Sequence, residues 1–230
     1  MHLVLIPGFW LDGASWDEVA EPLRDAGHTV HALTLPGREA ADVDRSGIGL
    51  RDHVEAVVAV VDSLADPVVL VGHSGGGAVA HAVVDARPDR IARVVYVDCL
   101  PLGHGDVIND ELPVVDGEVP LPDWSAFDDE DLVDLDDELR ARFRKIAVPE
   151  AVGVTRDAQV LGDVRRYEVP VTVIACEFPV EALRRWLADG LPFVAELARI
   201  TDVELVDLPT GHWPQLTRPA DLAAAILAAV

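Results

Sequence analysis

The chain has 230 residues, of which 50% are hydrophobic, and a formal net charge of −23. This length suits one domain with a sizeable core, and the hydrophobic content excludes an intrinsically disordered chain. The charge argues against nucleic acid or an anionic membrane as a partner, because phosphate groups would be repelled. No apolar run approaches the roughly 20 residues of a membrane span. The chain begins directly with an apolar strand pattern, so we expect a cytoplasmic protein without a signal peptide.

Six short apolar runs rich in β-branched residues predict the strands of a sheet. They lie at residues 3–6, 29–35, 68–72, 93–98, 170–175 and 203–208. Runs that are apolar at nearly every position suit a parallel sheet whose two faces are both covered by helices.

Helical patterns between these runs predict the covering helices. They lie at residues 15–26, 50–64, 76–86, 181–198 and 219–229. Ser15 is the expected N-cap of the first helix, and Pro219 suits the first turn of the last. The alternation predicts an α/β fold with a doubly wound, mostly parallel six-stranded sheet.

One segment interrupts this alternation between the fourth and fifth strands. Residues 101–139 contain fourteen Asp or Glu and no Lys or Arg, and a helical pattern returns at about 129–146. Two interpretations stand side by side: a small cap whose Trp124 and Phe127 line a pocket, or an acidic surface excursion that these aromatic residues anchor. We divide the chain into a core, residues 1–100 and 160–230, and an inserted cap, residues 101–159.

The run that ends at Val71 leads directly into Gly72-His73-Ser74-Gly75-Gly76 and then into a helical pattern. Gly-x-Ser-x-Gly between a strand and a helix is typical of a nucleophile elbow, a strained turn that exposes a serine hydroxyl. Glycine is needed two residues on either side of Ser74, because the flanks of such a turn approach closely. A phosphate-binding turn fits less well, since the G-x-G-x-x-G spacing and a P-loop lysine are both missing. Ser74 is therefore predicted to be a nucleophile.

A serine nucleophile requires a base, and the best placed histidine is His212 in Gly211-His212-Trp213-Pro214. This loop follows the last predicted strand, at the edge of the sheet where active residues collect. The other seven histidines lie at or before position 104, and His73 is expected to point away from the serine hydroxyl. His212 is therefore predicted to take the proton of Ser74.

Three motifs in order give the chain a resemblance to the α/β-hydrolase fold, and in style to its small serine esterases and hydroxynitrile lyases. They are Leu5-Ile6-Pro7-Gly8-Phe9-Trp10, the turn around Ser74, and the loop around His212. The resemblance spans nearly the whole chain. It implies an oxyanion hole formed by the backbone N–H groups of Phe9 and Gly75, and it implies neither a metal nor an organic cofactor.

The acid that would orient the histidine is less clear from the sequence. The family usually has an aspartate a few residues after the penultimate strand, where this chain has Phe178. Glu177 lies one position away, and Asp98 ends the preceding strand, where some relatives carry the acid. Both alternatives stay open, with Asp98 favoured for its reach to His212, while Asp207 is expected to be structural.

We expect a serine hydrolase that cleaves a small, largely apolar ester or lactone through an acyl-serine intermediate. Side chains expected to bind the substrate are Trp10, Trp124, Phe127 and Trp186. The alternatives are a carbon–carbon hydrolase or lyase that uses the same Ser/His pair, which the single lysine, Lys145, makes less favoured, and a binding protein without turnover. Cys99 and Cys176 are expected to be reduced thiols, and the protein to be a monomer or homodimer whose partner is its small-molecule substrate.

Overall fold

The computed structural model describes residues 1–230 and contains a six-stranded parallel sheet. The spatial order is β2-β1-β3-β4-β7-β8, with β3 and β4 at the centre. The strands are β1 (His2–Ile6), β2 (Thr29–Ala32), β3 (Val68–His73), β4 (Ile91–Val97), β7 (Val171–Ala175) and β8 (Val203–Asp207). The doubly wound α/β fold predicted from the sequence is confirmed.

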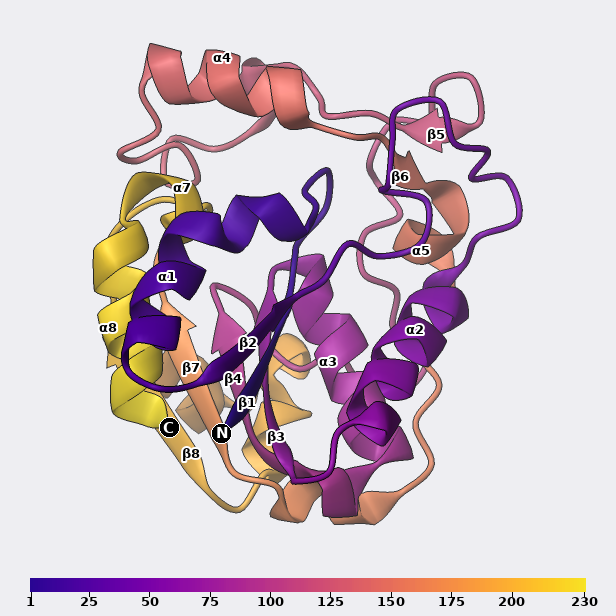
Figure 1. Cartoon of the computed structure of the whole chain (residues 1–230). Coiled ribbons are helices and arrows are strands. Elements are labelled where there is room, and N and C mark those ends of the chain that lie inside the picture. The colour runs from indigo at the N-terminus through magenta and orange to yellow at the C-terminus, as the bar shows by residue number, and fades with distance from the viewer.

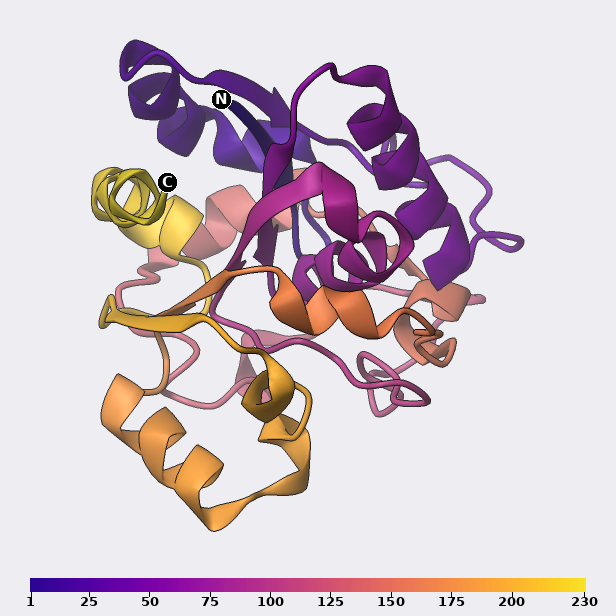
Figure 2. The same cartoon turned by 90° about the horizontal axis from the view of Figure 1, so that it is seen from below.

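Helices cover both faces of this sheet (Figures 1 and 2). One face packs against α1 (Asp17–Asp25) and α8 (Pro219–Ala229), and the other against α2 (Leu50–Ser63), α3 (Gly75–Ala86) and α6 (Val180–Asp189). The short helix α7 (Pro214–Thr217) directly precedes α8. No helix combines the length and the apolar character that a membrane crossing requires.

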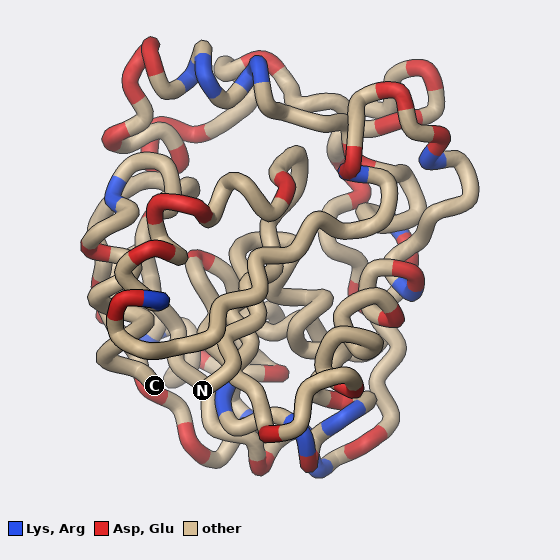
Figure 3. Tube along the Cα trace, viewed as in Figure 1, with Lys and Arg blue, Asp and Glu red and all other residues tan.

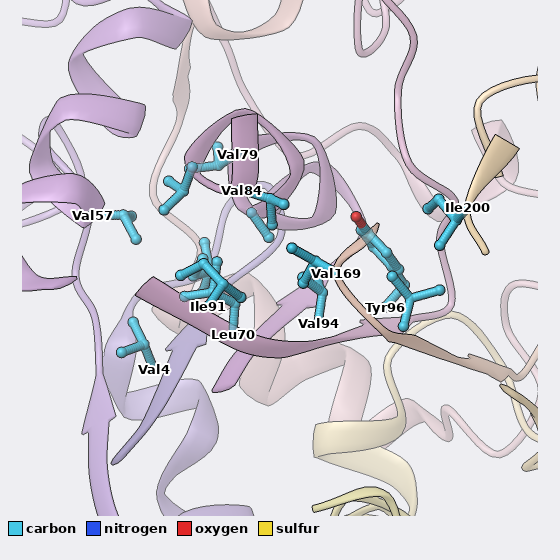
Figure 4. Close-up of a cluster of buried hydrophobic side chains, with 14 of the residues drawn as sticks. Val4, Val57, Leu70, Val79, Val84, Ile91, Val94, Tyr96, Val169 and Ile200 are labelled. Carbon is cyan, nitrogen blue, oxygen red and sulfur yellow. The ribbon is translucent and has the colours of Figure 1, made fainter. Parts of the chain in front are cut away.

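Alternate residues of the same strands build two separate hydrophobic cores. On the α3 side the sheet contributes Val4 and Leu70 to a cluster of buried side chains (Figure 4), whereas Leu5 and Val71 pack on the α1 side. Burial of one such side chain stabilises the fold by about 1.5–3 kcal/mol. The near-continuous apolar runs in the sequence therefore reflect a sheet with no solvent-facing side.

Several predicted boundaries differ from the observed ones for local reasons. The first helix is preceded by a 3-10 turn (Gly13–Trp16) that the Asp12 side chain caps, so the prediction of Ser15 as the N-cap was wrong. The predicted strand 29–35 ends at Ala32. The predicted helix 181–198 ends at Gly190, which adopts a left-handed conformation with φ 65°, and only short 3-10 turns follow.

The inserted segment 101–159 lies over the carboxyl ends of the strands (Figure 1). It contains a two-stranded antiparallel ribbon of β5 (Glu118–Val119) and β6 (Glu150–Ala151), together with α4 (Asp137–Ile146) and α5 (Val152–Arg156). The helical pattern predicted at 129–146 is realised only in α4. Acidic residues occur along most of the trace in Figure 3, whereas α4 concentrates four basic side chains above the sheet.

Candidate active site

Ser74 occupies the sharp turn between β3 and α3 with φ 51° and ψ −126°, a conformation that side chains rarely adopt. A Cβ atom at Gly72 would lie 2.7 Å from the Gly76 carbonyl oxygen, and one at Gly76 would lie 2.6 Å from that of Ile6. Both distances are too short for real side chains. The glycines at these positions therefore allow the turn to form and the Ser74 hydroxyl to project from it.

The loop after β8 brings His212 to this hydroxyl. His212 Nε2 lies 2.8 Å from Ser74 Oγ, and Nδ1 lies 2.8 Å from Asp98 Oδ2. Asp98 directly follows β4, next to β3 in the sheet, and has φ 49°. With the proton on Nδ1, the imidazole donates to Asp98 and accepts the hydrogen of Ser74, which is the form able to act as a base.

Both candidate acids reach the same nitrogen, but their surroundings differ. The Asp98 side chain is fully buried, and its Oδ1 accepts backbone N–H bonds from Cys176 at 2.8 Å and Glu177 at 3.0 Å. Glu177 Oε2 lies 3.2 Å from His212 Nδ1, makes no hydrogen bond, and belongs to a side chain that is 29% exposed. Asp98 is thus held by three hydrogen bonds, whereas Glu177 contributes mainly its charge.

These two carboxyl groups decide the protonation of the imidazole. Burial lowers the pKa of His212, but the hydrogen bond to Asp98 and the negative charges of Asp98 and Glu177 outweigh it and raise the pKa to about 10. Protonated His212 is therefore strongly stabilised in the free site.

His73 of the elbow points away from Ser74 and supports the loop of His212. Its Nε2–H donates to the His212 carbonyl oxygen at 2.6 Å, and its Nδ1 accepts from Gln215 Nε2 at 3.2 Å. Burial, and next the nearby His212, lower the pKa of His73 to about 3, so this ring is neutral. A neutral ring matches one donor and one acceptor, and His73 is fully satisfied.

The loop expected to supply the oxyanion hole is fixed by a buried arginine. Arg38 donates to the carbonyl oxygens of Gly8 and Leu11 and pairs with Glu150 of β6. The backbone N–H of Phe9 donates to no protein group, and the Phe9 ring lies against Gly75, at the N-terminus of α3. This arrangement leaves a donor next to the helix end that favours negative charge.

Two small cavities meet at Ser74 and His212, and both also touch Ile108. One has a volume of about 260 Å³ and the other of about 230 Å³. The first is further lined by Phe9, Trp10, Asn109, Leu112, Phe127, Asp131 and Glu177. The second is further lined by Gly75, Ala78, Asp98, Cys99, Leu100 and Leu102. The largest cavity, about 930 Å³, touches neither Ser74 nor His212.

Of the aromatic residues expected to bind substrate, the structure brings Trp10 and Phe127 to these cavities. Trp124 instead packs among Phe127, Phe143 and Trp213, and Trp186 packs against Phe178. Neither Trp124 nor Trp186 lines a cavity at Ser74. Residue type is the only sequence signal at either position, and it does not distinguish a tryptophan of a buried cluster from one that lines a cavity.

Other side chains near the site differ in how far the sequence could identify them. Asp207 caps α6 by accepting from the Val180 N–H at 2.7 Å, which is a structural role. Arg38 and Asp131 carried no sequence signal, because each is one polar residue in a loop.

Burial raises the pKa of the free thiols of Cys99 and Cys176, so neither is a ready thiolate.

Asp98, Glu177 and His212 offer oxygen and nitrogen atoms within 4.8 Å of one another, a spacing that a metal ion could bridge. The hydrogen-bond pattern instead indicates that these groups hold a proton between His212 and Asp98. Nδ1 carries the proton that it donates to Asp98, so this nitrogen has no lone pair for a metal.

Comparison with known proteins indicates the family to which the chain belongs. Lipase LipV of Mycobacterium tuberculosis is 29% identical over 195 residues, which cover 76% of this chain and 73% of the lipase. The carbendazim hydrolyzing esterase of Nocardioides sp. is 34% identical over 114 residues, which cover 49% of this chain and 47% of the esterase. The matched part is thus about half of that esterase.

Solved structures share the fold over the whole chain. An extracellular alpha/beta-hydrolase from a Paenibacillus species has a TM-score of 0.78 at 23% identity, covering 100% of this chain and 98% of that one. An Arabidopsis methylesterase has a TM-score of 0.77 at 18% identity, with the same coverage. The sequence profile of the Alpha/beta hydrolase family matches residues 3–225. The chain therefore belongs to the alpha/beta hydrolase family.

Proposed function

We propose that this protein is a serine hydrolase that cleaves small, largely apolar carboxylic esters or lactones through an acyl-serine intermediate. The observation that carries the proposal is the continuous hydrogen-bonded chain from Ser74 through His212 to Asp98. The named esterases and lipase among the relatives support ester hydrolysis as the reaction.

In the proposed reaction, Ser74 Oγ attacks the carbonyl carbon of the ester while His212 Nε2 takes the hydroxyl proton. Asp98 holds the resulting imidazolium through Nδ1. The N–H groups of Phe9 and Gly75 stabilise the negative charge on the former carbonyl oxygen. His212 then gives its proton to the leaving oxygen. In the second half, His212 takes a proton from water while the water oxygen attacks the acyl carbon, and it returns that proton to Ser74 Oγ as the acyl–serine bond breaks.

The cavities limit the size and polarity of the substrate. Their volumes of about 260 and 230 Å³ suit two short arms, one on each side of the ester bond at Ser74. Leu100, Leu102 and Ala78 make the second cavity largely apolar. Neither cavity is lined by Lys or Arg, so the site offers no cation to a carboxylate-bearing substrate.

The same pair could in principle serve carbon–carbon cleavage, but Lys145 gives that interpretation no support. The side chain is exposed on α4 and lines neither cavity. A binding protein without turnover would not need the oriented base, which His73 and Asp98 both hold in place.

The proposal is tested with short-chain nitrophenyl esters and mass spectrometry. Wild-type protein should hydrolyse them and carry a transient acyl group on Ser74, whereas Ser74→Ala should lose both the activity and the adduct. Asp98→Asn should retain the fold and lower kcat by about 10⁴-fold, because the imidazole is left in the wrong tautomer. Hydrolysis that survives Ser74→Ala would refute the mechanism.

A further inference from the structure

One residue of the inserted segment contacts the proposed base through its backbone and shares a cavity with it through its side chain. The backbone carbonyl of Asp131 accepts the His212 N–H at 2.8 Å, and the Val133 carbonyl accepts the adjacent Gly211 N–H at 3.1 Å. The Thr210 hydroxyl also donates to the Asp134 carboxylate at 3.1 Å. The segment 131–134 thus fastens residues 210–212, the loop that carries the imidazole.

The side chain of Asp131 lies in the same cavity as Glu177 and His212, so its carboxyl group faces the small space that the imidazole also faces. Glu177 in turn faces His212 Nδ1 at 3.2 Å without a hydrogen bond to it. Two carboxyl groups, Asp131 and Glu177, therefore share one small cavity with the imidazole.

We infer that Asp131 is a positioning residue for His212, whose carbonyl fixes the loop and whose carboxyl group adds negative charge to the cavity that the imidazole faces. This inference rests on the proposed role of His212 as the base. It goes beyond that role because it makes a residue of the inserted segment part of the control of proton transfer.

The direction of the effect follows from the charges around the imidazole. Four titratable groups face it: Asp98 after β4, Glu177 after β7, Asp131 from the inserted segment, and His73 from β3. Burial, and next the neighbouring Glu177 carboxyl group, raise the pKa of Asp131 to about 6. Above that pH, Asp131 adds a second negative charge beside Glu177 and so favours the protonated form of His212.

The ionisation of His212 can be measured directly by NMR of protein with ¹⁵N-labelled histidine, which requires no turnover. His212→Gln identifies the signal among the eight histidines. Asp131→Asn should lower the His212 midpoint by about 0.5–1 pH unit, and Glu177→Gln should lower it further because Glu177 is in direct contact. The acid limb of kcat/KM should move to lower pH by the same amounts.

A double mutant separates a direct effect of the Asp131 charge from an effect relayed by Glu177. In the Glu177→Gln background, Asp131→Asn should still lower the midpoint, because each carboxylate acts on the imidazole by its own charge. The matched control is Glu130→Gln, an exposed neighbour whose change should leave the midpoint in place. Asp131→Glu, which retains a carboxyl group, should restore most of the wild-type midpoint.

Two results would overturn the inference: an unchanged His212 midpoint in Asp131→Asn, or a shift that disappears in the Glu177→Gln background. Because the NMR titration is independent of catalysis, a protein that hydrolyses no ester would refute the proposed function while leaving this measurement valid.

Discussion

The His73 ring donates a hydrogen bond to the backbone carbonyl of His212 at 2.6 Å, so the residue before Ser74 supports the loop that carries His212. The two residues are 139 positions apart in the chain. A neutral, buried ring therefore joins the elbow to the far end of the sequence.

Replacement of His73 by Phe keeps an aromatic ring but removes this donor. The His212 carbonyl is then left without its partner, which should lower the free energy of unfolding by about 1–3 kcal/mol. We expect kcat to fall more than KM rises, because the base loses its position rather than the substrate its pocket. Urea unfolding and steady-state kinetics measure the two effects. Gln215→Leu, which removes only the partner of Nδ1, should have a smaller effect on kcat. If the two variants lost kcat equally, the bond from His73 to the His212 carbonyl would not be what positions His212.

The wild-type enzyme should be more active at alkaline than at neutral pH. The pKa of His212 is raised from 6.5 to about 10, and only the deprotonated imidazole can accept the Ser74 proton. The acid limb of kcat/KM should therefore lie well above 6.5, the ordinary pKa of histidine. A limb centred at or below that value in a pH–rate profile would contradict the charge arrangement around Nδ1.

The stability of the fold should fall over the same pH range in which the activity rises. A raised pKa in the folded state means that the ion pairs of His212 contribute their full stability below the unfolded value of 6.5. This contribution is lost as the pH rises toward about 10. Thermal unfolding of wild type and His212→Gln between these limits should show the difference between the two proteins shrinking as pH rises.

Gly211 provides the space in which the inserted segment meets the His212 loop. A Cβ atom at this position would lie 2.6 Å from the Val133 carbonyl oxygen and still closer to that of Asp131. Gly211→Ala should therefore displace the segment, destabilise the fold by about 1–3 kcal/mol, and lower kcat/KM by up to about 100-fold.

Gly47→Ala is the matched control, since a Cβ atom there meets nothing within 4 Å. Unfolding curves and kcat/KM of the two variants are compared. A Gly211→Ala enzyme that behaves like Gly47→Ala would show that the contact does not constrain the base.

The buried pair of Arg38 and Glu150 links the loop of Phe9 to the inserted ribbon. Arg38→Met leaves the Glu150 carboxylate buried without its partner and should cost about 3–5 kcal/mol of stability. The double variant Arg38→Met with Glu150→Gln should recover part of that loss, because no uncompensated charge remains. Urea denaturation of the three proteins measures this; a double variant less stable than the single one would contradict the pairing argument.

Much of the fold and the approach of His212 to Ser74 could be predicted from local sequence. The apolar run before Gly72 and the glycines around Ser74 predict the elbow, because few other sequences tolerate that turn. Pro219 marks the start of the last helix, which the structure confirms over residues 219–229. Each of these signals lies within a few neighbouring residues.

The features that the sequence could not resolve depend on contacts between distant segments. Asp98 and Glu177 both approach His212 Nδ1, and only the hydrogen-bond geometry distinguishes them. Asp131 is one of fourteen acidic residues in 101–139, and nothing in the sequence separates it from the others. Trp124 was expected near the substrate, yet it lies in a buried aromatic cluster, because residue type does not specify which side of a loop a ring faces.

The absence of Lys and Arg from both cavities bears on the release of product after hydrolysis. The proposed reaction turns a neutral ester into an alcohol and a carboxylate anion. That anion forms beside Glu177 and Asp131, inside a protein whose formal net charge is −23. Repulsion between like charges then speeds departure of the acid product and weakens its competition with fresh substrate, so turnover is protected from inhibition by accumulated product.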